Sequence, residues 1–207
     1  MKIITLLGPP AAGKGTQAAF FEKDGYFVFS FGQYMREQAA AGNPRFVEVK
    51  KIADTGALAS DELVAEVIGA VIEKKHRLGF KGVVLDGSPR TENQARLLDE
   101  LVARKSLPLK VIELRVPEDE LNRRRLKRIF DSHARNEPVR DDDMEDVFQR
   151  RMQIYRKQTL PVTEHYKQQP GVLSVVDAAT TPEQTWKLIQ KALQDSAPRV
   201  PPGPAPS

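Results

Sequence analysis

The stretch GPPAAGKGTQ, residues Gly8–Gln17, decides how the rest of this sequence is interpreted. It follows directly on the apolar run Ile3–Leu7, which predicts a buried β-strand. Where such a strand ends in glycine-rich backbone and a helix begins, amide groups and the helix dipole face any bound anion. The stretch therefore predicts a phosphate-binding loop in which Lys14 adds a point charge.

The spacing of this loop departs by one residue from the pattern G-x-x-x-x-G-K-[ST]. Gly8, Gly13 and Lys14 fall in register, but Gly15 occupies the hydroxyl position and Thr16 follows it. The backbone amides and the lysine do not depend on that hydroxyl, so we still expect a strand, a phosphate loop and a helix from Lys14 onward. The alternative is a glycine-rich turn that binds no ligand.

The composition favours a globular protein with one sizeable domain. The chain has 207 residues, of which 40% are hydrophobic and 29% charged, enough for a full core. Its formal charge of +4 permits an anionic partner without requiring a nucleic acid. The lack of cysteine excludes disulfides and thiolate metal cages and is compatible with a reducing compartment. No apolar segment is long enough for a signal peptide or a membrane span, so we expect a cytoplasmic protein without membrane or nucleic-acid partners.

Short β-branched runs alternate with longer helical patterns along the chain. This alternation favours an α/β fold, in which a parallel sheet carries helices on both faces. In residues 60–75, for example, apolar side chains recur at three- and four-residue steps. The strands are expected at Lys2–Leu7, Tyr26–Phe29, Gly82–Asp86, Leu109–Val116 and Val172–Asp177. Five parallel strands are enough for a three-layer fold.

Two segments interrupt this alternation, and a third follows it. Residues 30–59 come after the second strand, and residues 129–139 form a polar run between two basic helical stretches. Long connections in compact α/β proteins are often functional lids. The proline-rich composition of residues 196–207 predicts a disordered tail. We therefore expect one domain over residues 1–195, with an insertion at 30–59, to which the resemblance described below gives a monophosphate-binding role, a short lid at 129–139 and a tail.

A carboxylate at the end of an apolar strand is a candidate magnesium ligand. The run GVVLDG places Asp86 at the carboxyl end of its strand, where a parallel sheet meets its ligand. Such an aspartate can hold Mg²⁺ directly or through water. By itself the pattern is common, because strands often end in aspartate before a turn.

Taken together, several stretches resemble adenylate kinase and other nucleoside monophosphate kinases. GPPAAGKGTQ is similar to the phosphate loop of that family, SFGQYMR (30–36) to the start of its monophosphate-binding segment, and LDGSPRTENQ (85–94) to its second signature. ADTGALASDELV and VRDDDMEDVFQRRM continue the match, which runs from Met1 to about Leu193. The resemblance implies a P-loop kinase of the short-lid type, which transfers a phosphoryl group from Mg·ATP to AMP and gives two ADP.

The resemblance also implies roles for individual residues. Transfer between two nucleotides gathers negative charge in one cleft, and arginine suits this because its planar fork grips two phosphate oxygens. The implied ATP-binding residues are Gly8, Gly13, Lys14, Gly15, Thr16, Arg124 and Arg128. The implied AMP-binding residues are Phe31, Arg36, Gly87, Arg90, Gln94, Arg140 and Arg151. The implied catalytic residues are Lys14, Arg90, Arg124, Arg128, Arg140 and Arg151, and Asp86 and Thr16 are the implied Mg²⁺ residues, through water.

The basic run RRRLKR, residues 123–128, has a second interpretation. Arg124 and Arg128 are four residues apart and therefore share one face of a helix. An isolated run of this kind would favour a solvated basic face or a nucleic-acid patch. The surrounding signatures favour the phosphate-binding role here.

The acidic residues after the lid segment predict the start of a helix. Asp142 is expected to cap it, with Glu145 at the reciprocal position. The resemblance gives Asp142 and Asp143 a further role, which is to orient the lid arginines. Because the lid has no cysteine and one histidine, we expect Mg²⁺ and no zinc. The three histidines, none of them in a signature, are expected at the surface: His76, His133 and His165.

Four positions depart from the family pattern near the expected sites. Ala11 replaces the usual glycine of the loop. Phe31, Gln33 and Ser88 replace a threonine, an aspartate and a phenylalanine around the acceptor base. Phe31 could restore the aromatic surface that is lost at Ser88. Gln94 favours AMP, because a glutamine can pair with the adenine edge.

Three alternatives remain open on the sequence alone. The first is a UMP/CMP kinase, and the second is a P-loop switch or nucleic-acid-dependent ATPase, which would not need Arg36, Arg90 and Gln94 around a second nucleotide. The third is a degenerate relative that only binds nucleotides, which the retained Lys14 and Asp86 disfavour. A monomer is the default expectation for the oligomeric state.

Overall fold

Five parallel strands form the centre of the computed structural model, which describes residues 1–55 and 57–195. Their order across the sheet is β2-β3-β1-β4-β5. The strands are β1 (Lys2–Leu7), β2 (Phe27–Phe29), β3 (Gly82–Asp86), β4 (Leu109–Arg115) and β5 (Leu173–Asp177). The sequence prediction of an α/β fold with five parallel strands is confirmed, and every strand end lies within one residue of its expected place.

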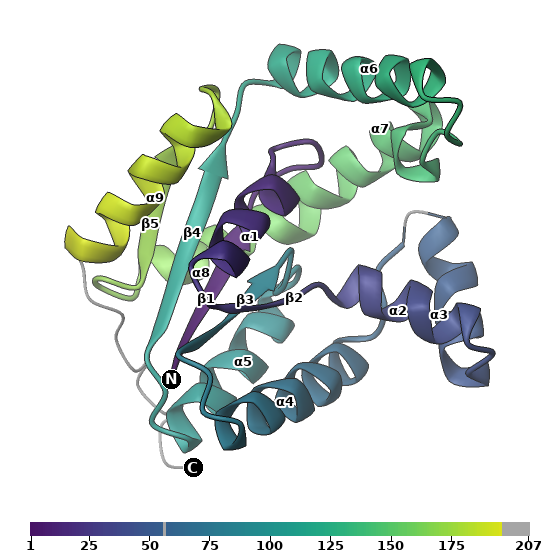
Figure 1. The fold of residues 1–207 in the computed structure, drawn as a ribbon. Helices are drawn as coiled ribbons and strands as arrows, with labels where there is room; N and C mark the ends of the chain where they lie inside the picture. Colours follow the sequence, from purple (N-terminus) through teal and green to yellow (C-terminus); the bar gives the residue numbers. More distant parts are fainter. Residues whose placement is uncertain (56, 196–207) are drawn as a thin grey trace.

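Helices cover both faces of this sheet (Figure 1). The central strand β1 sends Ile3 and Leu7 to one face and Ile4 and Leu6 to the other, all four buried. The helices against the two faces are α4 (Asp61–Arg77), α5 (Glu92–Arg104) and α8 (Leu160–Lys167) on the first and α1 (Lys14–Lys23) and α9 (Pro182–Asp195) on the second. A strand that is apolar on both faces is typical of such a buried parallel sheet.

Two helices fill the segment after β2. They are α2 (Phe31–Ala40) and α3 (Pro44–Asp54), which lie beside each other away from the sheet (Figure 1). Pro44 at the first turn of α3 suits a helix start because its missing N–H would have no partner there. Phe31, Met35 and Phe46 are buried and join the core cluster of the first face. This cluster ties the two-helix arm to the domain.

The segment expected to be a lid is more helical than the sequence indicated. Helix α6 runs from Glu118 to Ala134, so residues 129–134 continue it. An ion pair between Lys127 and Asp131, four residues apart, supports this extension. Residues 135–140 then connect to the short 3-10 turn η1 (Asp141–Asp143) and to α7 (Glu145–Ile154). The division of the chain into a domain, an insertion and a moving lid stays a prediction.

One π-helical turn, η2 (Tyr155–Thr159), joins α7 to α8 without a break in the helix. Its physical cause is Pro161, at the start of α8, which has no N–H and would clash with the carbonyl of a regular preceding turn. The wider turn places Tyr155 and Thr159 at the pocket described below.

Two sequence predictions are wrong. Asp142 does not cap α7: the N-cap is Met144, without a side-chain cap, because the Asp142 carboxylate pairs with Arg151 at 2.5 Å. His165 is only partly exposed rather than a free surface side chain, since its Nε2 lies 2.7 Å from the largely buried Asp99 carboxylate.

The proline-rich tail, expected to be disordered, lies outside the described residues. Within residues 1–55 and 57–195, no helix is long and apolar enough to cross a membrane.

Candidate active site

The loop after β1 needs glycine at its first residue. Gly8 has φ +147°, and a Cβ there would lie 2.8 Å from the Leu114 carbonyl oxygen. Gly13 is the N-cap of α1 at φ +92°, so the helix begins at Lys14. This arrangement of strand, loop and helix matches the prediction from the sequence. Ala11 has φ +64°, a left-handed conformation that costs a non-glycine residue about 1 kcal/mol or more.

Lys14 folds back over this loop. Its Nζ donates to the carbonyl oxygens of Gly8 at 2.7 Å and Pro9 at 2.8 Å. Burial lowers the pKa of Lys14 to about 7, and the charge of Arg90 acts in the same direction, while Asp86 opposes the shift. A phosphate group bound at the loop would supply a negatively charged partner for Lys14 and so favour its protonated form.

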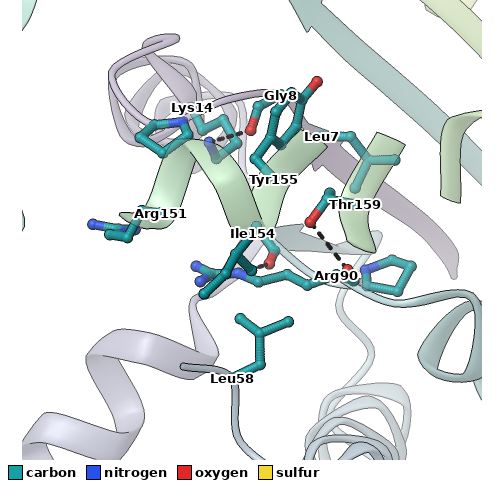
Figure 2. A pocket seen from close by; sticks show the side chains of 12 residues that line it. Leu7, Gly8, Lys14, Leu58, Arg90, Arg151, Ile154, Tyr155 and Thr159 are labelled. Carbon is teal, nitrogen blue, oxygen red and sulfur yellow. Dashed lines mark hydrogen bonds between the residues drawn. The ribbon is translucent and has the colours of Figure 1, made fainter. Parts of the chain in front are cut away.

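Arg90 and Arg151 face the same pocket as Lys14 (Figure 2). The Arg90 Nε donates to the Gly87 carbonyl at 2.8 Å, and the Thr159 hydroxyl donates to the Arg90 carbonyl at 3.0 Å. Burial lowers the pKa of Arg90 to about 10, with Arg151 adding to the shift, so the guanidinium stays charged at neutral pH. Three basic side chains therefore surround one small cavity of about 40 Å³.

A larger pocket of about 790 Å³ lies on the other side of the loop. Its walls come from residues 11–17, α6 and the connection between β5 and α9. Arg124 spans these three parts: its Nε pairs with Glu120 at 2.7 Å, and its terminal nitrogens donate to the carbonyls of Ala12 at 3.3 Å and Ala178 at 2.6 Å. The size falls in the range of about 300–1,000 Å³ that suits a small-molecule ligand.

Arg128 links this larger pocket to the cation cluster. Its Nη2 donates to the buried Asp143 carboxylate at 2.6 Å. Burial lowers the pKa of Arg128, Asp143 opposes this, and the charges of Arg140 and Arg151 lower it further. Arg140 and Arg151 thus both lie within electrostatic reach of Arg128. Their roles, and those of Asp142 and Asp143 in orienting them, stay predictions.

A third pocket, of about 60 Å³, lies between α2, α4 and the start of α5. Phe31, Ser88, Arg90 and Gln94 all line it, so two of the departures from the family pattern share one pocket. Arg36 is exposed, but its charge contributes to lowering the pKa of Arg90. The pocket is smaller than the roughly 300 Å³ or more that is typical of small-molecule sites.

The position of Asp86 fits a magnesium ion. Asp86 ends β3 beside Leu6 of the strand that enters the loop, and its Oδ2 lies 3.9 Å from where a side chain on Gly15 would begin. One carboxylate combined with phosphate oxygens and water is a donor set that Mg²⁺ prefers. Thr16 is exposed and lines the larger pocket. Among the described residues, no three or more His, Asp or Glu side chains form a cluster that could hold a metal ion by themselves.

Arg125 is a buried residue that the sequence analysis missed. Its Nη1 donates to the Asp143 carbonyl at 2.9 Å, its Nη2 pairs with the Glu145 carboxylate, and its guanidinium lies 5.2 Å from the centre of the Phe148 ring. Arg125 therefore fixes η1 and α7 against α6. The signal was available, because position 125 follows the apolar Leu121 by four residues on one helix face.

The comparison with known proteins agrees with this geometry. The family model described as adenylate kinase matches residues 6–170 of the chain. The chain belongs to the adenylate kinase family. An adenylate kinase of Methylobacterium nodulans is 40% identical over 200 residues, covering 96% of this chain and 98% of its own length. Adenylate kinases of Azorhizobium caulinodans and Vanderwaltozyma polyspora are each 38% identical, covering 92% of this chain and 98% and 95% of their own lengths.

Membership of the adenylate kinase family supports ATP:AMP phosphoryl transfer over the first two alternatives left open by the sequence. The matches run along nearly the whole chain and include both the phosphate loop and the acceptor signature. Nothing in them favours a UMP/CMP kinase. They also do not support a P-loop switch or a nucleic-acid-dependent ATPase.

The low pKa of Lys14 predicts that nucleotide binding takes up a proton. Without ligand, Lys14 loses its proton as the pH rises through about 7, whereas a phosphate at the loop raises the pKa toward the ordinary 10.5. Between these values, binding of Mg·ATP should take up as much as roughly one proton per site, and affinity should fall as pH rises. Calorimetry at pH 8.5 in buffers of different ionisation enthalpy measures the uptake.

The Lys14→Met variant is the control for protons that come from the nucleotide or from other groups. Its uptake should be smaller than that of the wild type by the contribution of Lys14. Equal uptake in the two proteins would show that Lys14 is already protonated without ligand.

Proposed function

We infer that the protein catalyses reversible phosphoryl transfer from Mg·ATP to AMP, giving two ADP. One observation carries this inference: Arg90 lines both the cation-rich pocket of Lys14 and the pocket of Phe31 and Gln94. Two nucleotides seated on the two sides of Arg90 would bring their phosphates together beside Lys14 and Arg151. A protein that only binds ATP has no need for the second pocket.

The proposed division of roles follows from where each charge lies. Lys14, Arg124 and Arg128 hold the phosphates of ATP, with the backbone of Gly8, Gly13, Gly15 and Thr16. Arg36 and Arg90 hold the phosphate of AMP beside Gly87, and Arg140 and Arg151 lie over the transferring group, held in place by Asp142 and Asp143. Preorganised cations of this kind stabilise the charge that spreads over the transferring group, and direct transfer needs no covalent intermediate.

Magnesium is the proposed cofactor, held by Asp86 and Thr16 through water. When bound, it neutralises charge on the ATP phosphates. Zinc is not expected, and metal analysis of untagged protein tests this. We also propose a cytoplasmic location and a monomeric state.

Gln94 and Phe31 are the proposed determinants of the acceptor base. Because Phe31 and Ser88 line the same pocket, the phenylalanine can supply the aromatic surface that the serine lacks. This supports AMP as the acceptor.

A panel of acceptors tests the proposed function directly. With Mg·ATP, we expect ADP formation with AMP at a kcat/KM well above that with UMP or CMP, and only slow hydrolysis with ATP alone. Formation of ADP and of the acceptor diphosphate is followed by chromatography. Comparable kcat/KM with UMP or CMP would contradict AMP specificity, and hydrolysis without any transfer would contradict the kinase function.

A further inference from the structure

The carboxylate of Asp61, at the start of α4, receives three hydrogen bonds from the start of α5. Its Oδ1 accepts from the Thr91 hydroxyl at 2.8 Å and from the Gln94 Nε2 at 2.9 Å. Its Oδ2 accepts from the Asn93 amide at 3.1 Å. The same Thr91 caps α5 by accepting from the Gln94 backbone N–H at 3.1 Å. Asp61 is therefore the shared hydrogen-bond acceptor of a polar cluster outside the phosphate site.

This cluster fixes which way the Gln94 side-chain amide points. The Gln94 Oε1 accepts from the Arg90 backbone N–H at 2.7 Å, while its Nε2 donates to Asp61. A carboxylate only accepts and a backbone N–H only donates. Rotating the amide by half a turn would therefore place two donors together at Arg90 and two acceptors together at Asp61. Gln94 is 5% exposed, so water cannot relieve that conflict. The amide has one allowed orientation.

An amide held in one orientation presents its hydrogen-bond donor and acceptor to a ligand in one fixed order. After these two bonds, Gln94 retains one N–H and one oxygen lone pair for a molecule in the pocket that it lines with Phe31 and Ser88. A 6-amino purine presents a donor at position 6 and an acceptor at N1. A 6-oxo purine presents the reverse order. An amide that could rotate would pair with either edge, whereas an amide held in one orientation pairs well with only one in a given binding pose.

We propose that Asp61 is a positioning residue that locks the Gln94 amide and thereby selects 6-amino over 6-oxo purine monophosphates. The proposal rests on the proposed function and adds to it the residue that sets the choice between AMP and IMP. Asp61 does not contact the nucleotide; it acts through Gln94.

The ratio of kcat/KM for AMP to that for IMP tests the proposal. Asp61→Ala should lower this ratio, by up to roughly tenfold, because one good amide pair to a base contributes discrimination of that order and only the Arg90 backbone N–H would still orient the amide. Asp61→Asn should keep most of the ratio, since its oxygen can still accept from Gln94. In a Gln94→Ala background, Asp61→Ala should have no further effect on the ratio.

Glu62→Ala is the matched control, because Glu62 is an exposed acid in the same first turn of α4. It should leave the ratio unchanged. A merely structural role for Asp61 would lower activity with AMP and IMP equally, and that result would overturn the proposal. If Asp61→Ala does not fold, as judged by circular dichroism, Asp61→Ser gives the same test. Failure of the proposed function itself would appear differently, as a wild type that does not phosphorylate AMP.

Discussion

Replacing Arg128 or Arg140 with alanine should lower kcat by roughly 10² or more while ATP affinity changes modestly. Arg128 lies on α6 and Arg140 directly before η1, and the charges of Arg140 and Arg151 both act on Arg128. Charge on the transferring group spreads most in the transition state, so cations that reach it only on closure contribute mainly to kcat. Steady-state kinetics with both nucleotides varied gives kcat, and equilibrium titration gives ATP affinity.

Arg135→Ala is the matched control for this prediction. Arg135 lies in the same connection but pairs with the exposed Glu137 at 2.9 Å, an ion pair of little energetic consequence. Closure can be followed independently: an analogue that joins two adenosines through five phosphates should protect residues 129–140 from protease more than ATP alone. Wild-type kcat in both arginine variants, or equal protection without any ligand, would show that the segment is static.

Arg90→Ala should lower kcat/KM for AMP by roughly 10²-fold or more, because the proposed charge-assisted contact of its guanidinium with the AMP phosphate would be lost. The backbone of Arg90 is held by Gln94 and Thr159, so the alanine variant keeps those hydrogen bonds and loses the guanidinium with its bond to the Gly87 carbonyl. Initial rates at saturating Mg·ATP with varied AMP give the change.

Two further variants separate charge from shape at this position. Arg90→Lys should recover only part of the loss, since an ammonium group supplies the charge without the planar fork. Arg96→Ala, an exposed arginine on α5, should behave as the wild type. A kcat/KM for AMP within about twofold of the wild type in Arg90→Ala would remove Arg90 from the acceptor site.

The strands and the phosphate loop could be predicted because their causes are local. Apolar β-branched runs and the glycines at 8 and 13 specify strand and turn within a few residues. The end of α6 was misplaced because residues 129–134 lack an apolar stripe, and charge pairing along the helix supports them instead. A polar helix of this kind resembles a loop in sequence.

The remaining errors concern pairs that form only in the folded protein. Aspartate is a common helix-capping residue, but the Asp142 carboxylate pairs with Arg151 instead. No local sequence pattern indicates this pairing. His165 pairs with Asp99, which lies 66 residues earlier in the sequence. The sequence analysis assigned Gln94 to the expected acceptor site but did not indicate its hydrogen bond with Asp61. That bond joins the starts of two helices that are far apart in the chain.

The π-helical turn at Tyr155–Thr159 has a consequence for how the long helix from Glu145 to Lys167 serves two purposes. Such a turn accommodates one extra residue, and each residue of an α-helix advances the rotation by about 100°. The half before the turn places Arg151 at the pocket of Lys14 and Arg90, and the half after it buries Val162 and Tyr166 in the core. The added residue rotates the second half of the helix relative to the first. The direction of Arg151 and the burial of Val162 and Tyr166 can therefore be set independently along one continuous helix.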